Sequence, residues 1–356
     1  MNIAVLLSGG VDSSVALKLL QEQGYNITAF YLKIWLEDEL SFLGDCPWET
    51  DLSFVRETCK QANIPLEVVS LQEEYKKRII SYTISEVKAG RTPNPDVLCN
   101  TRVKFGAFYD LFGQEFDRVA TGHYAAIERK DGIAYLKTTP DPIKDQTYFL
   151  SHLSQSQLQK AEFPIGIYQK HQVRELAEKY NLPSQSRKDS QGLCFLGKIK
   201  YSDFIKAHLG ENPGNIVDFD TQKVIGQHKG LWFHTIGQRQ GLGLSGGPWY
   251  VVAKDVRSNN LYISRHYQEL KKDSLIAVDC NWVAGFNPDL SQNIEVKLRH
   301  GAIKTPAECI YSLNDRSLDN IKVKLSSKDQ GVAPGQFVAF YQGDYCLGSG
   351  RIELDV

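Results

Sequence analysis

The N-terminal half of the chain alternates short apolar runs with segments of helical periodicity. Residues 2–7 form a continuous apolar run, which is typical of a buried strand. Residues 12–23 place apolar side chains at helical spacing, and Gly24 follows as a stop signal. We expect further strands at 27–34, 66–70 and 117–121 and further helices at 51–62, 72–89 and 100–112. Alternating strands and helices predict a doubly wound α/β domain with a parallel sheet.

The pattern changes after about residue 205. Helical periodicity fades there, and short β-forming runs alternate with turns rich in Gly and Pro, such as 241–249 and 333–336. Such runs are typical of small β-barrels or sandwiches. We expect strands at 223–225, 231–236, 249–253, 261–264, 275–284, 294–300, 307–311, 321–325 and 336–341. The chain is thus predicted to hold an α/β domain over 1–208, a small central β-rich domain over 209–272 and a C-terminal β-barrel over 273–356.

Composition is that of a water-soluble globular protein. The chain has 356 residues, enough for two or three domains, and 42% of them are hydrophobic. Its 41 basic and 42 acidic residues nearly cancel, so a nucleic-acid ligand would need basic side chains clustered on one face. No apolar run approaches the about 18 residues of a membrane span. The first residues lack a basic leader and run into a glycine turn, so we expect a strand there rather than a signal peptide.

Cysteine usage indicates a reducing compartment. The chain has seven cysteines, an odd number without the tight spacing of a small disulfide scaffold. We therefore expect a cytoplasmic protein whose thiols stay available for chemistry. Five of the seven lie in mostly apolar or helical surroundings, where a cysteine is usually a small buried hydrophobe. Cys99 and Cys194 are the two exceptions.

A glycine-containing string, SGGVDSS at 8–14, lies between the first expected strand and the first expected helix. Gly9 and Gly10 let backbone N–H groups approach an anion, and a helix N-terminus favours phosphate. No Lys follows the second glycine at the Walker spacing. The string resembles the pyrophosphate-binding loop of the PP-loop ATPases, which cleave ATP between the α and β phosphates and adenylate an oxygen. The resemblance implies an activating enzyme rather than a kinase.

The two exceptional cysteines have distinctive neighbours. Cys99 lies three residues after Asp96, near an expected helix start and close to Arg102 and Lys104. A thiol in such surroundings is expected to be partly ionised. Cys194 lies in a basic, polar loop that contains glycine. Loops of this kind can move and often carry function.

Over essentially its full length the chain resembles the tRNA 2-thiouridylase family. The matching strings are SGGVDSS (8–14), NPDVLCN (94–100), ATGHYA (120–125), KDQTYFL (144–150), DSQGLCF (189–195), TIGQRQGL (235–242) and APGQFVAFY (333–341). Members of this family make 2-thiouridine at the wobble position of tRNA, using Mg-ATP and releasing AMP and pyrophosphate. The resemblance implies a PP-loop domain of the adenine nucleotide alpha hydrolase type. It also implies two partners, the anticodon stem-loop of tRNA and a protein that donates persulfide sulfur.

The resemblance assigns the chemistry to a few side chains. Cys194 would carry the incoming persulfide, Cys99 would be the nucleophile and resolving thiol, and Asp96 would be the acid/base group. Asn94, Pro95 and Asp96 would line the pocket for the target base. A disulfide between Cys99 and Cys194 would be the by-product and would need an external reductant. The sequence leaves open whether Cys99 releases bound sulfide or the persulfide attacks the ring directly.

The resemblance also implies two sets of binding residues. The ATP-binding set is Leu7, Ser8, Gly9, Gly10, Val11, Asp12, Ser13, Ser14, Leu32 and Gly122. Leu32 stands where many family members have Met, and an apolar or backbone contact with adenine suits either residue. The tRNA-binding set is His123, Lys144, Asp145, Gln146, Arg299, His300 and Gln336. Basic residues expected on the RNA-binding surface are Arg102, Lys104, Lys144, Arg187, Lys188 and Arg299.

Three other interpretations share some of these features. Another PP-loop ATPase could adenylate a small substrate for amide or amine transfer, but it would not need the two cysteines. An ATP-regulated RNA-binding module would keep the β domains without catalysis. Cys99 and Cys194 could also join a third ligand at an iron–sulfur cluster. No HExxH and no paired CxxC is present, so we expect no resident metal centre.

Overall fold

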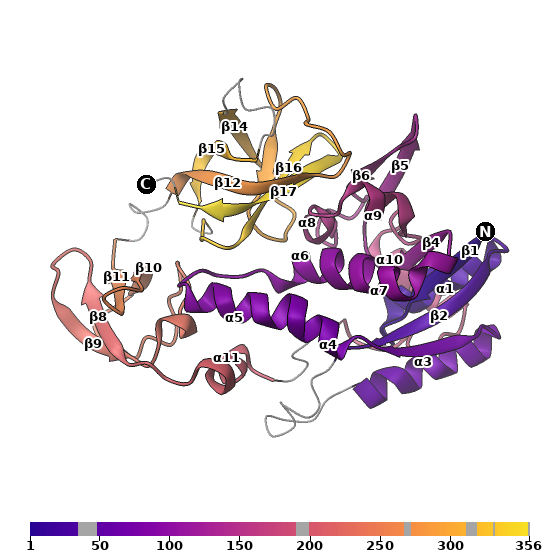
Figure 1. Ribbon diagram of the computed structural model, residues 1–356, viewed down its shortest axis with the longest axis horizontal. Coiled ribbons are helices and arrows are strands. Elements are labelled where there is room, and N and C mark those ends of the chain that lie inside the picture. Colours follow the sequence, from indigo (N-terminus) through magenta and orange to yellow (C-terminus); the bar gives the residue numbers. More distant parts are fainter. Residues whose placement is uncertain (35–47, 190–198, 267–271, 311–318, 330–331, 355–356) are drawn as a thin grey trace.

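The computed structural model describes residues 1–34, 48–189, 199–266, 272–310, 319–329 and 332–354. A parallel sheet of strand order β3-β2-β1-β4-β7 forms the core of the N-terminal half (Figure 1). Its strands are β1 (Asn2–Leu6), β2 (Asn26–Lys33), β3 (Leu66–Ser70), β4 (Arg118–Thr121) and β7 (Ala161–Glu162). The order turns back between β1 and β4, as expected for a doubly wound domain.

The two faces of this sheet are covered by different helices. Ile3 and Val5 of β1 pack with residues of α1 (Val11–Glu22) and α3 (Trp48–Ala62). Ala4 and Leu6 point to the opposite face, because side chains alternate along a strand. That face packs against a second layer of helices: α4 (Gln72–Tyr75), η2 (Lys76–Ile80), α5 (Ser81–Lys88), α6 (Pro95–Cys99), η3 (Asn100–Ala107) and α7 (Phe108–Leu111). The predicted doubly wound architecture is confirmed.

The helix expected at 100–112 begins earlier, at Pro95. Asn94 is its N-cap, and its Oδ1 accepts a hydrogen bond of 3.4 Å from the backbone N–H of Val97. Proline suits the first helical position because its missing N–H would be unpaired there anyway. Cys99 therefore lies inside the helix rather than before it. Further helices among the described residues are η4 (Gly113–Glu115), α8 (Thr147–Leu150), α9 (Gln155–Lys160), α10 (Lys170–Lys179) and α11 (Tyr201–Leu209).

A small sheet of order β10-β11-β8-β9 forms the central β-rich part. Its strands are β8 (Gly214–Asp218), β9 (Val224–His228), β10 (Tyr250–Asp255) and β11 (Asn260–Ser264). The strand expected at 231–236 is wrong, because Leu231–Phe233 form a 3-10 turn, η5. Leu231 packs into the small β core, whereas Trp232 and Phe233 pack against the core of the α/β half. Trp232 and Phe233 are consecutive and pack against the same core, which the alternation of side chains along a regular strand would not allow.

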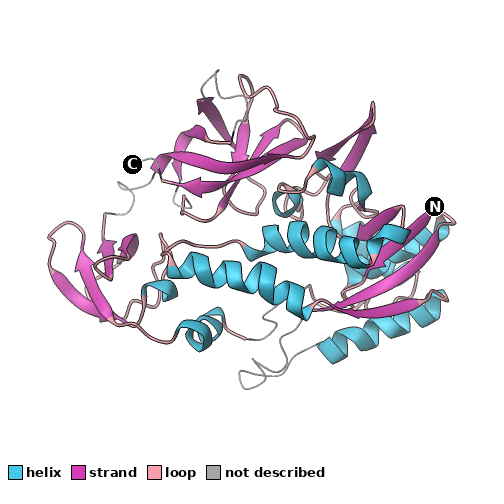
Figure 2. Ribbon diagram, viewed as in Figure 1, coloured by secondary structure: helices cyan, strands magenta, loops and turns pink. Residues whose placement is uncertain are grey.

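The C-terminal part is a closed β-barrel, as predicted. The strands run in the order β12-β15-β14-β13-β16-β17, and pairing of β12 with β17 closes the ring. They are β12 (Lys272–Trp282), β13 (Glu295–Lys297), β14 (Thr305–Ile310), β15 (Ile321–Asp329), β16 (Phe337–Gln342) and β17 (Tyr345–Glu353). Figure 2 shows helices gathered in the α/β half and strands dominating the rest.

A hairpin from the N-terminal half extends the barrel sheet. Strands β5 (Ala126–Lys130) and β6 (Ile133–Lys137) pair with each other, and β6 pairs with β17 through Cys346 and Leu136. The apolar core of the α/β half also includes Phe337 and Tyr341 of the barrel. The barrel and the α/β domain thus share a sheet and an apolar core and are not joined by a linker alone.

A buried ion pair crosses this junction. Lys297 Nζ of β13 lies 3.2 Å from Asp145 Oδ1, and the two side chains are 2% and 1% exposed. The carboxylate also accepts hydrogen bonds from Thr147 Oγ1 at 2.5 Å and from the backbone N–H of Thr139 at 3.1 Å. Such a pair costs desolvation energy when it forms, but leaving one partner unpaired costs considerably more.

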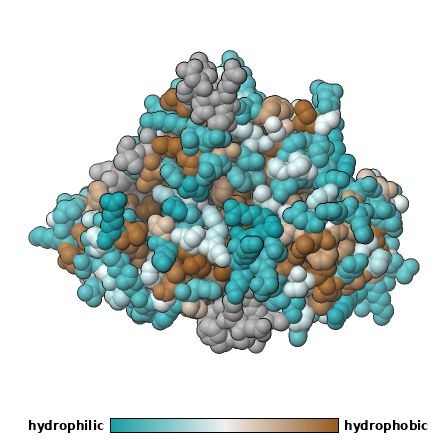
Figure 3. Space-filling view, viewed as in Figure 1, coloured by the Kyte–Doolittle hydropathy of each residue, from teal (hydrophilic) through white to brown (hydrophobic). Residues whose placement is uncertain are grey.

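Hydrophilic residues predominate on the face shown in Figure 3, with hydrophobic residues in scattered groups between them. Within the described residues, no helix is long and apolar enough to cross a membrane.

The Asp145–Lys297 pair leads to a prediction about stability. Lys297→Met should lower the free energy of unfolding by about 3 kcal/mol, because it leaves a buried carboxylate without its cation. Urea titration of both proteins measures the difference. Lys206→Met, which removes an exposed ion pair with Glu211, is the control and should change little. Adding Asp145→Asn to Lys297→Met should recover part of the loss, and an undiminished loss would contradict this account.

Candidate active site at the phosphate loop and the Asn94 turn

The expected ATP-binding residues gather at the carboxyl ends of three neighbouring strands. Residues 7–10 leave β1, Gly122 leaves the adjacent β4, and Leu32 lies near the end of β2. Doubly wound sheets bind ligands at this edge, where the strand order reverses. The structure therefore brings together residues separated by more than a hundred positions in the sequence.

The loop before α1 is shaped by glycine and by its own hydroxyl groups. Gly9 has φ of +75°, and a Cβ there would lie 2.6 Å from the carbonyl oxygen of Asp51. The hydroxyls of Ser13 and Ser14 donate to the carbonyl oxygen of Gly10 at 3.3 and 2.9 Å. The loop leads directly into the N-terminus of a twelve-residue helix, whose first N–H groups and dipole favour a phosphate.

Gly122 lets the end of β4 touch the first turn of α1. A Cβ at Gly122 would lie 2.5 Å from the backbone nitrogen of Ser13 and 2.7 Å from the carbonyl carbon of Asp12. Only glycine permits so close an approach. The two glycine positions leave backbone, rather than side chains, around the helix N-terminus, and this arrangement fits the phosphates of a nucleotide.

Asp12, in the first turn of α1, is held by two donors from other elements. The hydroxyl of Tyr124 donates to its Oδ1 at 2.8 Å, and Lys170 Nζ lies 2.8 and 3.0 Å from its two oxygens. Burial raises the pKa of Tyr124 well above its usual range, and the Asp12 charge adds to this effect. Tyr124 therefore stays protonated and donates. Lys170 lies outside the family strings, and Tyr124 lies in the string at 120–125 but has no role assigned from the sequence.

Lys170 also lies 2.9 Å from Asp189, which is the meeting point of three cations. Lys144 Nζ is 2.7 Å and Arg174 Nη2 is 2.6 Å from the same carboxylate. Burial alone would raise the pKa of Asp189, but the hydrogen bonds from Lys144 and Lys170 outweigh it and lower the pKa below the usual range. Asp189 is therefore ionised at neutral pH. Lys144, an expected tRNA contact, is joined in this way to Asp12 of the phosphate loop.

Arg187 makes a second connection to the phosphate loop. Its Nη1 donates to the carbonyl oxygen of Gly9 at 2.8 Å, and its Nη2 pairs with Asp51 at 2.7 Å. Cys194, the expected persulfide carrier, lies outside the described residues, and so does the expected Cys99–Cys194 disulfide. Their roles stay predictions.

The expected target-base turn is held from the barrel side. Gln336 Nε2 donates to the carbonyl oxygens of Thr92 and Pro93, both at 3.0 Å. Asn94 Nδ2 lies 3.3 Å from Gln336 Oε1 and 3.3 Å from the hydroxyl of Tyr148. The structure thus joins Asn94, expected at the base, to Gln336, expected at the tRNA.

Cys99 is 3% exposed and lies one helical turn after Pro95, within the apolar core. Asp96 is partly buried in the first turn of the same helix, and its carbonyl oxygen accepts a hydrogen bond from Asn100 at 3.2 Å. Arg102, which the sequence placed near the thiol, donates to the carbonyl oxygen of Arg78 at 3.3 Å. The guanidinium is thus engaged at η2, on a neighbouring helical segment.

The other expected tRNA contacts differ in accessibility. His123 Nδ1 lies 2.7 Å from Thr121 Oγ1, and burial lowers the pKa of His123, so the ring is neutral. Gln146 Oε1 accepts a hydrogen bond of 2.9 Å from the backbone N–H of Tyr124. Asp145 is buried in its ion pair with the barrel. Its carboxylate serves the domain junction in this structure.

Two expected contacts lie together on the barrel. The ring of His300 stacks on Phe149 with centroids 5.0 Å apart. Arg299 is exposed and forms a two-point ion pair with Asp329 at 2.8 and 3.1 Å. Several of the basic residues expected on the RNA-binding surface are thus paired with carboxylates, so phosphates would compete with these partners. They are Lys144, Arg187 and Arg299.

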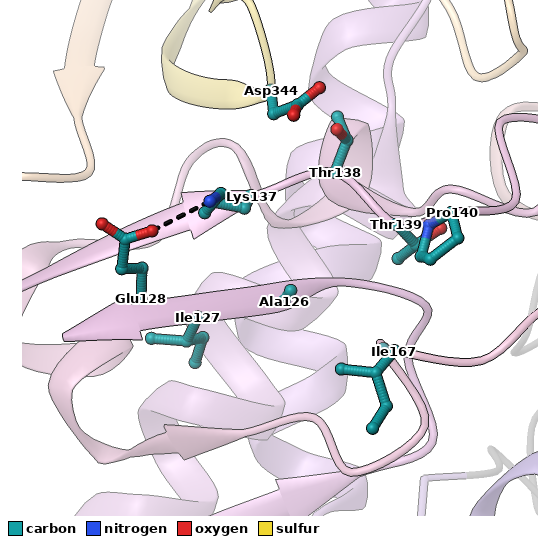
Figure 4. Close-up of a pocket in the computed structure, with 10 residues that line it drawn as sticks. Ala126, Ile127, Glu128, Lys137, Thr138, Thr139, Pro140, Ile167 and Asp344 are labelled. Atoms are coloured by element: carbon teal, nitrogen blue, oxygen red, sulfur yellow. Dashed lines mark hydrogen bonds and ion pairs between the residues drawn. The ribbon is translucent and has the colours of Figure 1, made fainter.

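An open cavity of about 600 Å³ beside the β5–β6 hairpin lies apart from these residues (Figure 4). Its lining includes the ion pair of Glu128 and Lys137 at 2.8 Å and contains none of the expected site residues. Within the described residues, no group of three or more His, Cys, Asp or Glu side chains is arranged to hold a metal ion. The candidate site is therefore assigned to the phosphate loop and the Asn94 turn.

The strand order, the glycine loop and the helix N-terminus define a nucleotide-binding α/β protein of the PP-loop class, extended by two β domains. Family models match in three consecutive parts: the tRNA methyl transferase HUP domain over 1–198, the tRNA methyl transferase PRC-barrel domain over 202–265 and the aminomethyltransferase beta-barrel domain over 272–352. The chain belongs to the tRNA 2-thiouridylase family.

Full-length relatives carry that family name. The chain is 47% identical to the tRNA-specific 2-thiouridylase MnmA of Parabacteroides distasonis, over 99% of both chains. It is 44% identical to the protein of the same name from Porphyromonas gingivalis, again over 99% of both chains. Identity to tRNA-specific 2-thiouridylase MnmA 1 of Bacteroides thetaiotaomicron is 46%, with the same coverage.

The contact between Gly122 and α1 leads to a prediction about nucleotide binding. Gly122→Ala should weaken ATP binding at least about tenfold, because the new Cβ forces the first turn of α1 to move. Equilibrium binding of a fluorescent ATP analogue measures the affinity. Gly132→Ala is the control, since it strains a glycine with φ of +78° in a turn with nothing within 4 Å. Equal losses in both variants would show that the effect is not specific to the loop.

Proposed function

We propose that this protein is a tRNA sulfurtransferase that replaces the C2 oxygen of the wobble uridine with sulfur. The observation that carries the proposal is full-length similarity, at 44 to 47% identity, to proteins named tRNA-specific 2-thiouridylase. The site adds support, since a phosphate loop and a buried cysteine beside a capped turn occur in one chain. A PP-loop enzyme for amide transfer would require no cysteine at that turn.

The phosphate loop would bind the β and γ phosphates of ATP through the N-terminus of α1. Mg²⁺ would accompany the nucleotide, and Asp12 is the carboxylate that the loop offers. Lys170 and Arg187 supply positive charge beside a loop that has no lysine of its own. ATP supplies an adenylyl group, and the uridine oxygen becomes part of an AMP leaving group while pyrophosphate departs. Attack by that oxygen requires loss of the N3 proton, for which Asp96 is the proposed base.

Sulfur transfer then needs two thiols and one external reductant. The terminal sulfur of a persulfide on Cys194 would reach C2 either directly or as sulfide released when Cys99 attacks the sulfur attached to Cys194. On both routes AMP leaves, the C2–S bond forms and a Cys99–Cys194 disulfide remains. Two external thiols, or one external dithiol, would reduce this disulfide and leave as a disulfide themselves.

The burial of Cys99 suits this chemistry. An adenylated uridine is prone to hydrolysis, and a thiol 3% exposed within apolar side chains meets it where little water can reach. The barrel would help to place the RNA, because Gln336 already holds the turn that leads to the base. A protein donor would deliver the persulfide, and we expect the reaction in the cytoplasm.

The proposal predicts specific products. Incubated with tRNA, Mg-ATP and a persulfide donor, the protein should form 2-thiouridine, with AMP and pyrophosphate in equal amounts. Mass spectrometry of tRNA nucleosides and chromatography of the nucleotides measure both. Asp12→Ala should reduce turnover much more than tRNA affinity. Formation of ADP, or of amidated small molecules without any thiolated tRNA, would rule the proposal out.

The two cysteines should fail at different steps. Cys194→Ser should not accept labelled sulfur from the donor yet should still form AMP-activated tRNA. Cys99→Ser should accept the label but transfer it to tRNA at less than about one hundredth of the normal rate, since the resolving thiol is missing. Cys59→Ser, which replaces a buried cysteine of the opposite sheet face, is the control. If Cys194→Ser loads sulfur normally, the proposed division of roles is wrong.

A further inference from the structure

A small cavity opens beside the target-base turn, between the α/β half and the central β domain. It has a volume of about 160 Å³. Pro93 and Pro95 line it from the turn, Tyr201 lines it from α11, and Trp232 and His234 line it from the segment around η5. Lys254 of β10 lines it from the central domain, and Arg91, which is paired with Glu86, lines it from the α/β half. Two parts of the chain that separate family models describe thus share one cavity.

This cavity and the Asn94 side chain lie on different sides of the turn. The amide of Asn94 bonds toward Tyr148 and Gln336, on the side of α8 and the barrel. The two prolines line the cavity on the side of α5, α11 and the central domain. In Figure 1, α6 lies between the barrel and α5, in agreement with these contacts. The cavity is therefore next to the expected target-base site without being lined by Asn94 or Asp96.

Two polar groups in the lining have no partner among the described residues. His234 is 8% exposed, and its Nδ1 is buried without a hydrogen-bond partner. No carboxylate or carbonyl group in the described part of the chain accepts a hydrogen bond from the Lys254 ammonium. Burial lowers the pKa of Lys254 to about 8, so it is still mostly charged at pH 7. Buried polar groups without partners are uncommon, and a ligand is one way to satisfy them.

The chemistry of the lining favours a planar ring with both donors and acceptors. Burial, with His228 and Lys254 nearby, lowers the pKa of His234 to about 4, so its ring is neutral and offers one donor and one acceptor. Lys254 adds donors, and Tyr201 and Trp232 add aromatic surface. Aromatic side chains stack on bases in many proteins that bind single-stranded RNA. A phosphate would find mostly apolar walls, and Arg91, the second cation of the lining, is already paired with Glu86, so this lining suits a phosphate poorly.

The volume limits the ligand to one ring. An apolar cavity of about 150 Å³ in another protein accommodates a benzene molecule. The volume of about 160 Å³ therefore matches one pyrimidine ring better than the fused rings of a purine. Uracil and cytosine each present carbonyl, N–H or ring-nitrogen groups on one edge, which match the Lys254 donor and the neutral imidazole.

We propose that this cavity is a second base-binding pocket, which holds one pyrimidine of the RNA immediately next to the target nucleotide. This inference rests on the proposed function, because only an RNA substrate brings a neighbouring base to the turn. RNA enzymes that work on a base commonly extrude it from its stack. Holding the adjacent base in a separate pocket would keep the extruded uridine extended toward Cys99 and would add selectivity for a pyrimidine at that position.

A thermodynamic cycle tests the pocket. Binding of anticodon stem-loop RNAs is measured by fluorescence anisotropy, with the intact loop and with a single abasic nucleotide at the target position or at either neighbour. Lys254→Met and His234→Phe remove the polar groups while keeping the bulk of the side chains. Lys223→Met, in the exposed turn before β9, is the matched control. Thermal unfolding of each variant confirms that it is folded.

Each substitution in the pocket should weaken binding of the intact loop on the order of tenfold, as expected for loss of one held base. The abasic RNA at the neighbouring position should bind the wild type about equally weakly, and the pocket variants should show no further loss with it. Lys223→Met should behave as the wild type throughout. The proposal would be overturned if the effects of the pocket substitutions and of the abasic nucleotide added at every RNA position. It would also be overturned if they failed to add only at the target position, or if Lys223→Met weakened binding as much as the pocket variants. Thiolation of the intact RNA by the wild type, measured first, tests the proposed function separately.

Discussion

The buried pair of Asp145 and Lys297 constrains how the barrel meets the α/β domain. Each charge alone would cost several kcal/mol in that interior, so the two domains can dock closely only where the charges meet. Tyr148 adds a directional contact, because its hydroxyl donates to the carbonyl oxygen of Phe337 at 3.1 Å. With this docking fixed, Gln336 reaches the carbonyl oxygens before Asn94. The shape of the Asn94 turn is therefore set by a domain that begins more than a hundred residues later in the chain.

The sequence alone predicts an element correctly where a local signal determines its structure. The glycines and short polar side chains of 8–14 predict a strand–loop–helix corner, and the structure confirms one. The strand predicted at 231–236 is wrong because Leu231–Phe233 form a 3-10 turn in which Trp232 and Phe233 pack against the same core, and the sequence of one segment does not reveal that contact. The β5–β6 hairpin escaped prediction for a similar reason, since its place is fixed by pairing with β17. Tertiary contacts decide such segments, and propensity is only a weak guide to them.

In the candidate site too, some residues are marked by local sequence strings and others are brought there only by the fold. Family strings identified the phosphate loop and the Asn94 turn, but Lys170 lies in an ordinary polar stretch and only the fold brings it to Asp12. Cys99 was expected before a helix at 100–112 and lies inside one, because Asn94 is the N-cap and the helix begins at Pro95. The sequence around Asp145 does not indicate that its carboxylate has a buried cationic partner. The functions assigned to Cys99, Cys194 and the tRNA-binding residues stay predictions.

The carboxylate of Asp189 has a consequence for how two substrates influence each other. It holds Lys144 on one side and Lys170 on the other, and Lys170 in turn holds Asp12. If RNA phosphates draw Lys144 away, Asp189 keeps fewer cations and holds Lys170 more strongly, which alters the charge presented to a nucleotide at α1. Thermodynamic reciprocity then requires the nucleotide to change RNA affinity by the same factor. If both ligands bind as proposed, this ion-pair network would couple their affinities through Asp189.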